Sequence, residues 1–288
     1  MPPGSRDCLL IPGWMHKNQK EKISMKITVV VGEGDSASLV SEFGLSLLLE
    51  NEGKSFLFDT GAGEALTANL KTLGIAPEKY ARVILSHGHY DHTGGLAHLD
   101  PEEIWCCPGV EDPQYSRHAD GSVHNISMPQ NSIEVARKSK VTPLTLFDFI
   151  GYGIFLTGPI PRVSPEKCGG DFFHDEKCTE KDIVPEEQAL LSTDGVLVTG
   201  CCHAGIINTL LFCHKILPEL PVRTIVGGLH LKNADETRLE QTANIIRQFK
   251  VKNLYLMHCT GEKAVQYLRE HLPECRIYTP APGESFEC

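Results

Sequence analysis

Four side chains that commonly bind metal ions lie within six consecutive residues of this chain. They are His87, His89, Asp91 and His92, in the sequence Ser-His-Gly-His-Tyr-Asp-His-Thr-Gly-Gly. On an extended path His87 and His89 point to the same side, because side chains repeat every two residues along a strand. Once the chain turns into a helix, Asp91 and His92 can form a second position beside the first. Imidazole binds zinc, iron and manganese, and a carboxylate adds a hard oxygen ligand to the set. The run therefore predicts a metal site.

The run follows a predicted strand, so its side chains belong to the loop at the carboxyl end of that strand. Tyr80–Leu85 combines β-branched and apolar residues and ends at a polar turn. Other apolar runs and amphipathic segments predict further elements. They are strands at 26–31, 46–50, 55–59, 189–192, 196–199, 222–226 and 253–257, and helices at 63–73, 206–217, 236–250 and 262–272.

Two sheet-rich halves, each with helices on its outside, imply an α/β fold with four α/β/β/α layers. We take residues 25–288 as a single domain of this kind. Two polar, irregular stretches at 108–140 and 159–187 interrupt the pattern of strands. Loops of this length inside a compact domain are usually functional or mobile, so we expect loop insertions, or a lid, near the metal site.

Several motifs, in order along the chain, resemble those of the metallo-β-lactamase superfamily. Besides the run described above, they are Phe58-Asp59-Thr60-Gly61, Thr199-Gly200-Cys201-Cys202-His203-Ala204-Gly205 and Leu256-Met257-His258-Cys259-Thr260-Gly261. The likeness covers about residues 25 to 280. Together with these motifs, Gly158–Arg162 and Glu187–Leu190 are similar to the branch named after an archaeal dihydropterin synthase of methanopterin biosynthesis. The resemblance implies the same four-layer sandwich, a metallo-β-lactamase-like fold with its metal loops at one end of the paired sheets.

The resemblance also implies a dinuclear site. Its first metal takes His87, His89 and His203, and its second takes Asp91, His92 and His258. A lone histidine is more often a partly buried imidazole than a ligand. His203 and His258, however, each follow a predicted strand inside a matching motif, which favours ligation. The expected cofactors are two divalent metal ions, with zinc as the first choice and iron or manganese as alternatives.

Asp59, at the end of its strand, is expected to brace the metal loop without binding metal. The cysteines beside the ligands, Cys201, Cys202 and Cys259, are expected to pack as thiols. On a strand, the neighbour of a ligand faces the other way.

The chain departs from the family pattern at the fifth motif. Many relatives place an Asp or Cys ligand after the strand that corresponds to 222–226, whereas this chain has Gly227-Gly228-Leu229-His230. Either the bridging ligand is absent, or His230 reaches in as a ligand or catalytic group. The alternative role for His230 is to close the start of the following helix. Loss of a bridging carboxylate would weaken the second metal.

Other residues are candidates for handling the substrate. Asp91 could orient the attacking water or accept its proton, so Asp91 and His230 are the candidate catalytic residues. Arg162 and Lys167 are cations that could hold an anionic group. Glu187 and Gln188 are further loop candidates for substrate binding.

The composition of the chain limits which partners and which cellular compartment we expect. With 27 Lys and Arg against 37 Asp and Glu, the 288-residue chain carries a formal net charge of −10, which argues against nucleic acid as the main partner. The 11 cysteines, an odd number with adjacent pairs at 106–107 and 201–202, favour reduced thiols in a cytoplasmic protein.

No run reaches the roughly 18–20 apolar residues that span a bilayer. Residues 1–24 lack the apolar centre of a signal peptide and predict a poorly ordered extension.

These observations predict a metal-dependent hydrolase that uses a metal-bound hydroxide on a small anionic substrate, a phosphoester or a pterin-related phosphate. One alternative is a dihydropterin-type transferase that displaces diphosphate. The others are a di-iron redox protein and a metal-binding protein without turnover. The sequence leaves the oligomeric state open.

Overall fold

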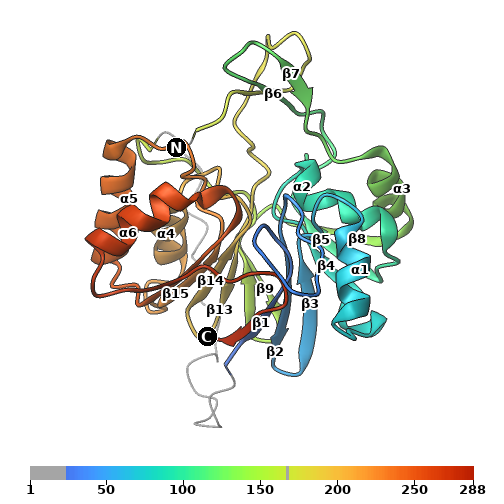
Figure 1. Ribbon diagram of the computed structural model, residues 1–288, viewed down its shortest axis with the longest axis horizontal. Coiled ribbons are helices and arrows are strands. Elements are labelled where there is room, and N and C mark those ends of the chain that lie inside the picture. The colour runs from blue at the N-terminus through green and yellow to red at the C-terminus, as the bar shows by residue number, and fades with distance from the viewer. Residues whose placement is uncertain (1–23, 167–168) are drawn as a thin grey trace, which may run out of the picture.

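Two seven-stranded sheets form the centre of the computed structural model, which describes residues 24–166 and 169–288 (Figure 1). In order across the first sheet, the strands are β18 (Ser285–Glu287), β1 (Lys26–Val31), β2 (Ser46–Asn51), β3 (Lys54–Phe58), β4 (Arg82–Ile84), β5 (Glu103–Cys106) and β8 (Lys140–Pro143). In order across the second, they are β17 (Arg276–Tyr278), β16 (Asn253–Leu256), β15 (Thr224–Gly227), β14 (Val196–Thr199), β13 (Leu190–Ser192), β10 (Ile154–Leu156) and β9 (Asp148–Gly151).

Helices cover the outer face of each sheet, which gives the expected α/β/β/α order of layers. Helices α1 (Ala65–Thr72) and α3 (Gln130–Lys138) pack on the first sheet. Helices α4 (Ile206–Ile216), α5 (Glu236–Gln248) and α6 (Glu262–His271) lie on the second (Figure 1). The prediction of a four-layer sandwich is therefore confirmed.

Alternating side chains on the strands fill three separate apolar layers. In β3, Phe56 and Phe58 point into the core between the sheets, whereas Leu57 points toward α1. In β14, Val198 belongs to the same central core and Leu197 packs under α4–α6. Strands that are buried on both faces are apolar throughout, which explains why these segments read as short continuous apolar runs.

The chain leaves the parallel strands at one edge of the sandwich. Strand β3 pairs in parallel with β4, and β14, β15 and β16 are parallel neighbours. The loops that follow these strands begin at Asp59, Leu85, Gly200, Gly228 and Met257. Because parallel strands of a sheet end at a common edge, the loops after β3 and β4 meet at one end of the first sheet, and those after β14, β15 and β16 meet at one end of the second. Contacts of His92 with Cys201 and His258 bring these two ends together.

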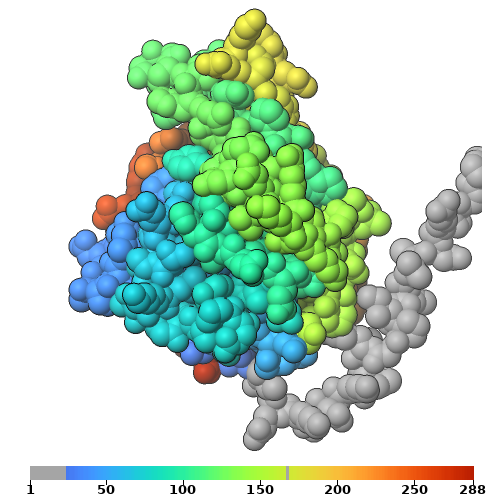
Figure 2. Space-filling model, turned by 90° about the vertical axis from the view of Figure 1, so that its right-hand side faces the viewer, coloured from blue at the N-terminus to red at the C-terminus, as the bar shows by residue number. Residues whose placement is uncertain are grey.

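The two stretches predicted to be irregular pair with each other over this end. Strands β12 (Lys181–Asp182), β11 (Phe172–Phe173), β6 (Tyr115–Arg117) and β7 (Val123–Asn125) form an antiparallel sheet, which we call the small sheet. It stands above the body in Figure 1, and Figure 2 shows its green and yellow segments side by side. The predicted insertions near the metal site are therefore present, and they also carry short strands. The sequence did not indicate these strands, because strands of two or three residues from distant segments leave no local pattern.

The predicted extension lies outside the described residues, except for Ser24. Lys167, one of the candidate substrate residues, also lies outside them. Among residues 24–166 and 169–288, no helix is long and apolar enough to cross a membrane.

Candidate metal centre

Six predicted ligand side chains meet at the edge where the parallel strands end. Loops after β4, β14 and β16, together with the short helix α2 (Tyr90–Thr93), position them. All six side chains are almost completely buried: His87, His89, Asp91, His92, His203 and His258.

Asp91, His92 and His258 form one tight group. The Nε2 atoms of the two histidines lie 3.2 Å apart, and Asp91 Oδ2 lies 3.2 Å from His258 Nε2 and 3.6 Å from His92 Nε2. Ligand atoms at about 2.0–2.2 Å from a tetrahedral metal stand roughly 3.3–3.5 Å from one another. The spacings therefore fit a coordination sphere.

His87 and His203 form a second group, with their Nε2 atoms 3.3 Å apart. The ring of His89 lies beside both, with centroids 4.5 Å from His87 and 4.8 Å from His203. His89 Nε2 is buried and has no hydrogen-bond partner among the described residues. A buried polar atom normally has a partner, so an unpartnered imidazole nitrogen beside two other imidazoles fits the role of a metal ligand.

Burial keeps this second group in the neutral form that binds metals. It lowers the pKa of His87 and His203 well below the usual value and that of His89 to about 3. Burial acts in the opposite direction on Asp91, but His92 and His258 still hold the pKa of this carboxyl below its ordinary value. At neutral pH the imidazoles of His87, His89 and His203 are thus neutral. Burial acts to lower the pKa of His92 and His258 as well, but Asp91 raises both, that of His258 well above its usual value, so a metal that binds there displaces a proton.

Asp59 and Ser86 set the orientation of two of these imidazoles. Asp59 Oδ2 lies 2.7 Å from His92 Nδ1 and accepts a 2.7 Å hydrogen bond from Ser86 Oγ. Ser86 Oγ in turn lies 2.8 Å from His87 Nδ1. Because Ser86 donates its only hydroxyl proton to Asp59, the His87 Nδ1–H donates to Ser86, which leaves Nε2 with its lone pair. The predicted contact between Asp59 and the metal loop is confirmed.

The close approach of these loops requires a glycine at position 200. A Cβ built there would lie 2.1 Å from Ser86 Oγ and 2.9 Å from Asp59 Oδ2. Backbone strain also gathers around the centre, because Asp59, His230 and His258 have φ angles of 57°, 49° and 51°. Non-glycine residues rarely adopt these angles, and such strain clusters at functional sites.

Cys201 corrects one expectation from the sequence. Its Sγ lies 3.2 Å from His92 Nε2, so the thiol faces the histidines instead of packing away from them. The alternation argument failed because β14 ends at Thr199 and the chain bends before Cys201. Cys202 does pack away, with its Sγ 3.7 Å from Thr209 Oγ1 in the layer under α4.

His230 lies at the edge of the centre. Its ring centroid is 4.4 Å from that of His203, and it forms a further group of possible ligands with Cys201 and Cys259. The alternative role, closing the helix start, is carried out by Asp235, which accepts the backbone N–H of Arg238 at the start of α5.

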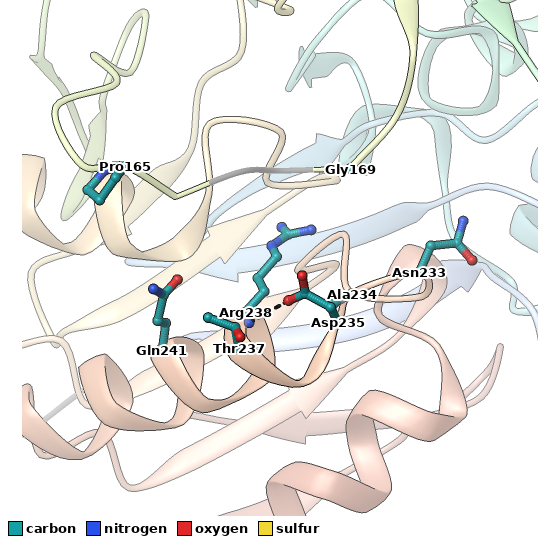
Figure 3. Close-up of a pocket in the computed structure, with 8 residues that line it drawn as sticks. All are labelled: Pro165, Gly169, Asn233, Ala234, Asp235, Thr237, Arg238 and Gln241. Carbon is teal, nitrogen blue, oxygen red and sulfur yellow. Dashed lines mark hydrogen bonds between the residues drawn. The ribbon is translucent and has the colours of Figure 1, made fainter.

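Arg238 fixes the backbone at His230. Its Nη1 donates to His230 O at 2.7 Å, and its Nε lies 3.9 Å from Glu166 Oε1. Figure 3 shows the Arg238 side chain extending away from α5, near Asp235 at the start of that helix. The arginine thus connects α5 to the loop that carries His230.

The candidate substrate residues have different surroundings. Arg162 is partly exposed and donates to the backbone carbonyls of Ile183 and Val184. Glu187 is buried, and its carboxylate accepts the N–H groups of His203 and Ala204 at 2.6 Å each.

Gln188 is also buried and donates from Nε2 to the Leu85 carbonyl at 2.9 Å. Through these contacts both residues brace the ligand loops, and Gln188 Oε1 has no hydrogen-bond partner among the described residues. A role for Glu187 and Gln188 in binding substrate stays a prediction.

Two residues near the centre were not singled out from the sequence. Glu186 accepts from the Gly88 N–H at 3.2 Å and from Gln114 Nε2 at 2.8 Å, and burial raises the pKa of its carboxyl to about 7. Phe172 of the small sheet lies with its ring 5.1 Å from that of His89 and 5.2 Å from that of His203. No pattern in the sequence indicated a role for either residue, because both lie in the stretch that was predicted to be irregular.

Comparisons with known proteins show which proteins this chain resembles. The family profile of the metallo-beta-lactamase superfamily matches residues 41–174. The chain is 29% identical over 264 residues to the 7,8-dihydropterin-6-methyl-4-(beta-D-ribofuranosyl)-aminobenzene-5'-phosphate synthase of Methanocaldococcus jannaschii, which covers 84% of this chain and 88% of that protein.

Solved structures give the same result. A metal-dependent hydrolase of the beta-lactamase superfamily is similar with a TM-score of 0.81 and 29% identity, over 92% of this chain and 99% of that one. A diphosphatase of the PhnP family has a TM-score of 0.54 and 13% identity, over 92% of this chain and 98% of that one, and shares the fold alone.

Proposed function

Because the chain belongs to the metallo-β-lactamase superfamily, we propose that it is a metal-dependent hydrolase of small anionic substrates. The observation that carries this proposal is the convergence of five imidazoles and one carboxylate at one edge of the sandwich. The ligand atoms of Asp91, His92 and His258 lie 3.2–3.6 Å apart, and those of His87 and His203 lie 3.3 Å apart. A group of buried histidines without a structural partner for each nitrogen is costly unless a cation binds them.

The proposed ligands fall into two sets. His87, His89 and His203 hold one metal, and Asp91, His92 and His258 hold the other. Zinc is the first choice because imidazole-rich sites favour it, with iron or manganese as alternatives. Divalent cations at such a centre supply Lewis acidity and lower the pKa of water to about 7, so that a nucleophile is available at neutral pH.

The residues around the centre orient the substrate and exclude water. Arg162 is a candidate for an anionic group, because its guanidinium is partly exposed and partly offsets the rise that burial causes in the pKa of Glu187, which contacts the backbone of His203. Two backbone carbonyls hold this guanidinium. Phe172 forms an apolar wall beside His89 and His203, against which a flat substrate can pack. We therefore propose a phosphoester, or a pterin-related phosphate, as the substrate.

A substrate panel tests this function. The full chain, supplied with zinc, is assayed against phosphomonoesters, phosphodiesters, a lactone and a thioester. We expect hydrolysis of a phosphoester that is abolished by a chelator and by His203→Ala. The matched control is His271→Ala, an exposed histidine on α6, which should keep full activity. Activity that survives both the chelator and His203→Ala would refute the proposal.

A group-transfer reaction is the second candidate. It is favoured by the similarity to the M. jannaschii synthase, which extends over most of both chains. Incubation with a pterin diphosphate, with and without an aromatic acceptor, separates the two functions. A transferase releases diphosphate only when the acceptor is present, whereas a hydrolase releases its product in either case.

A further inference from the structure

The Cys201 thiol lies between the two sets of proposed ligands. It belongs to a group with Asp91, His92 and His258, and also to a group with His87 and His203. In each group all the ligand atoms lie within 4.8 Å of one another, and Cys201 Sγ is 3.2 Å from His92 Nε2. The residue is 3% exposed. No other residue belongs to both of these groups in the described part of the chain.

The local backbone explains why this thiol faces inward. Strand β14 ends at Thr199, and Gly200 packs directly against Ser86 and Asp59. Cys202 then takes a φ of 63°, which turns its own side chain toward α4. Two adjacent cysteines therefore have opposite environments, one in the centre and one in the apolar layer.

The end of β15 has no room for a bridging side chain. A Cβ built on Gly228 would lie 2.6 Å from Cys259 Sγ and 2.6 Å from the Gly200 carbonyl oxygen. A carboxylate at this position would displace the loop that carries Cys201. A side chain that lies between the two sets of ligands therefore comes from the loop after β14 and not from the loop after β15.

We propose that Cys201 Sγ binds both metal ions as a bridging thiolate, an inference that depends on the two-metal centre of the proposed function. A sulfur about 2.3 Å from each metal spans ions that are about 3.5–4 Å apart. Coordination forms two metal–sulfur bonds and breaks the S–H bond, and the proton passes to solvent. A soft thiolate in this position selects zinc over harder ions such as manganese.

Cobalt(II) is the probe that tests this directly. Metal-free full-length protein is titrated with cobalt(II), and its near-ultraviolet and visible absorption is recorded. A thiolate ligand gives an intense sulfur-to-cobalt charge-transfer band, whereas histidine and carboxylate ligands give only weak d–d bands in the visible range. We expect the wild type to show the charge-transfer band and Cys201→Ser to lose it while keeping the d–d bands. Cys202→Ser, the matched control, should keep the charge-transfer band.

A second nearby thiol is that of Cys259, whose Sγ lies 3.4 Å from the Cys201 carbonyl oxygen. The variant Cys259→Ser shows whether this thiol contributes to the charge-transfer band. We expect this variant to keep the band. X-ray absorption of zinc-loaded wild-type protein should also give a zinc–sulfur distance of about 2.3 Å, a result that requires no variant to fold.

The outcomes distinguish the bridge from the metal centre itself. Cobalt bound with d–d bands but without a charge-transfer band overturns the bridge and leaves the metal centre intact. A band that persists in Cys201→Ser and disappears in Cys259→Ser also overturns it. Failure of the wild type to bind cobalt at all would overturn both this inference and the proposed function.

Discussion

Asp59 is the residue through which the first sheet orients the candidate ligands. Its carboxylate is fully buried, accepts the Ser86 N–H at 2.7 Å, and contacts both Ser86 Oγ and His92 Nδ1. A negative charge in this position raises the basicity of the imidazole that it contacts and fixes the tautomer. An amide would offer a donor where a carboxylate accepts.

We predict that Asp59→Asn weakens metal binding by about 10- to 100-fold without unfolding the protein. Competition with a chromophoric chelator measures the affinity. Asp148→Asn, at an exposed position on β9, is the control and should bind like the wild type. Equal affinity in the two variants would show that Asp59 has no role in metal binding.

His258 tests the second metal position. Its Nε2 contacts both Asp91 and His92, so its removal takes a ligand from that set alone. We predict that His258→Ala lowers kcat by about 10²- to 10³-fold, the usual cost of losing one electrostatic stabiliser of a developing charge. Activity should rise with added metal, and the circular dichroism spectrum should stay unchanged. Wild-type turnover at low free metal would indicate a mononuclear mechanism.

Single residues were predictable where the chemistry required a residue type at a fixed spacing. The six proposed ligands could be identified because histidines and an aspartate follow strands inside recognisable motifs. Cys201 was wrongly assigned because the alternation of a strand was extended beyond Thr199, its last residue. The backbone contacts of Glu187 and Gln188 could not be predicted, because polar residues in a loop can bind backbone as readily as substrate.

At the scale of elements, the loops at the carboxyl ends of parallel strands build the site. Strands such as 26–31 and 196–199 were predicted with the bounds that the structure has, because apolar runs that are buried on both faces give a strong pattern. The strands β5, β8, β9 and β10 were not predicted. Strands β8 and β9 lie at the edges of the two sheets and are largely exposed, so they lack a continuous apolar run. The small sheet depends on pairing between segments more than 50 residues apart, such as Phe172 with Ser116, so no local pattern indicates it.

The contact between two of these loops gives a prediction about Gly200. A methyl group there would overlap Ser86 Oγ and press on Asp59, so we expect Gly200→Ala to lower the free energy of unfolding by about 1–3 kcal/mol and to weaken metal binding. Gly63→Ala is the matched control, because the nearest atom to its Cβ would be Glu42 Oε2 at 3.8 Å. Urea denaturation with and without a chelator measures both effects. Equal stability in the two variants would contradict the close packing of these loops.

At the scale of the whole molecule, we propose that residues 25–288 form a single folding unit. Met25 is fully buried in the core between the sheets, and β1 pairs with both β2 and the C-terminal β18. A chain that begins at Met25 therefore keeps every contact described above except the hydrogen bond of Ser24 to Glu287.

We predict that this truncated chain has the same melting temperature and the same metal content as the full chain. Differential scanning calorimetry and metal analysis measure the two quantities. A loss of several degrees, or of a metal ion, would show that residues 1–24 belong to the folded core.

Metal analysis of the freshly purified full chain, expressed with added zinc, tests whether this edge of the sandwich binds two metal ions. The site geometry predicts about two transition-metal ions per chain, and about one in each of His203→Ala and His258→Ala, because each variant removes a ligand from one set alone. His271→Ala, outside the centre, should retain both ions. Wild-type protein without bound transition metal, or a stoichiometry unchanged in both ligand variants, would contradict the assignment of this edge of the sandwich as a two-metal centre.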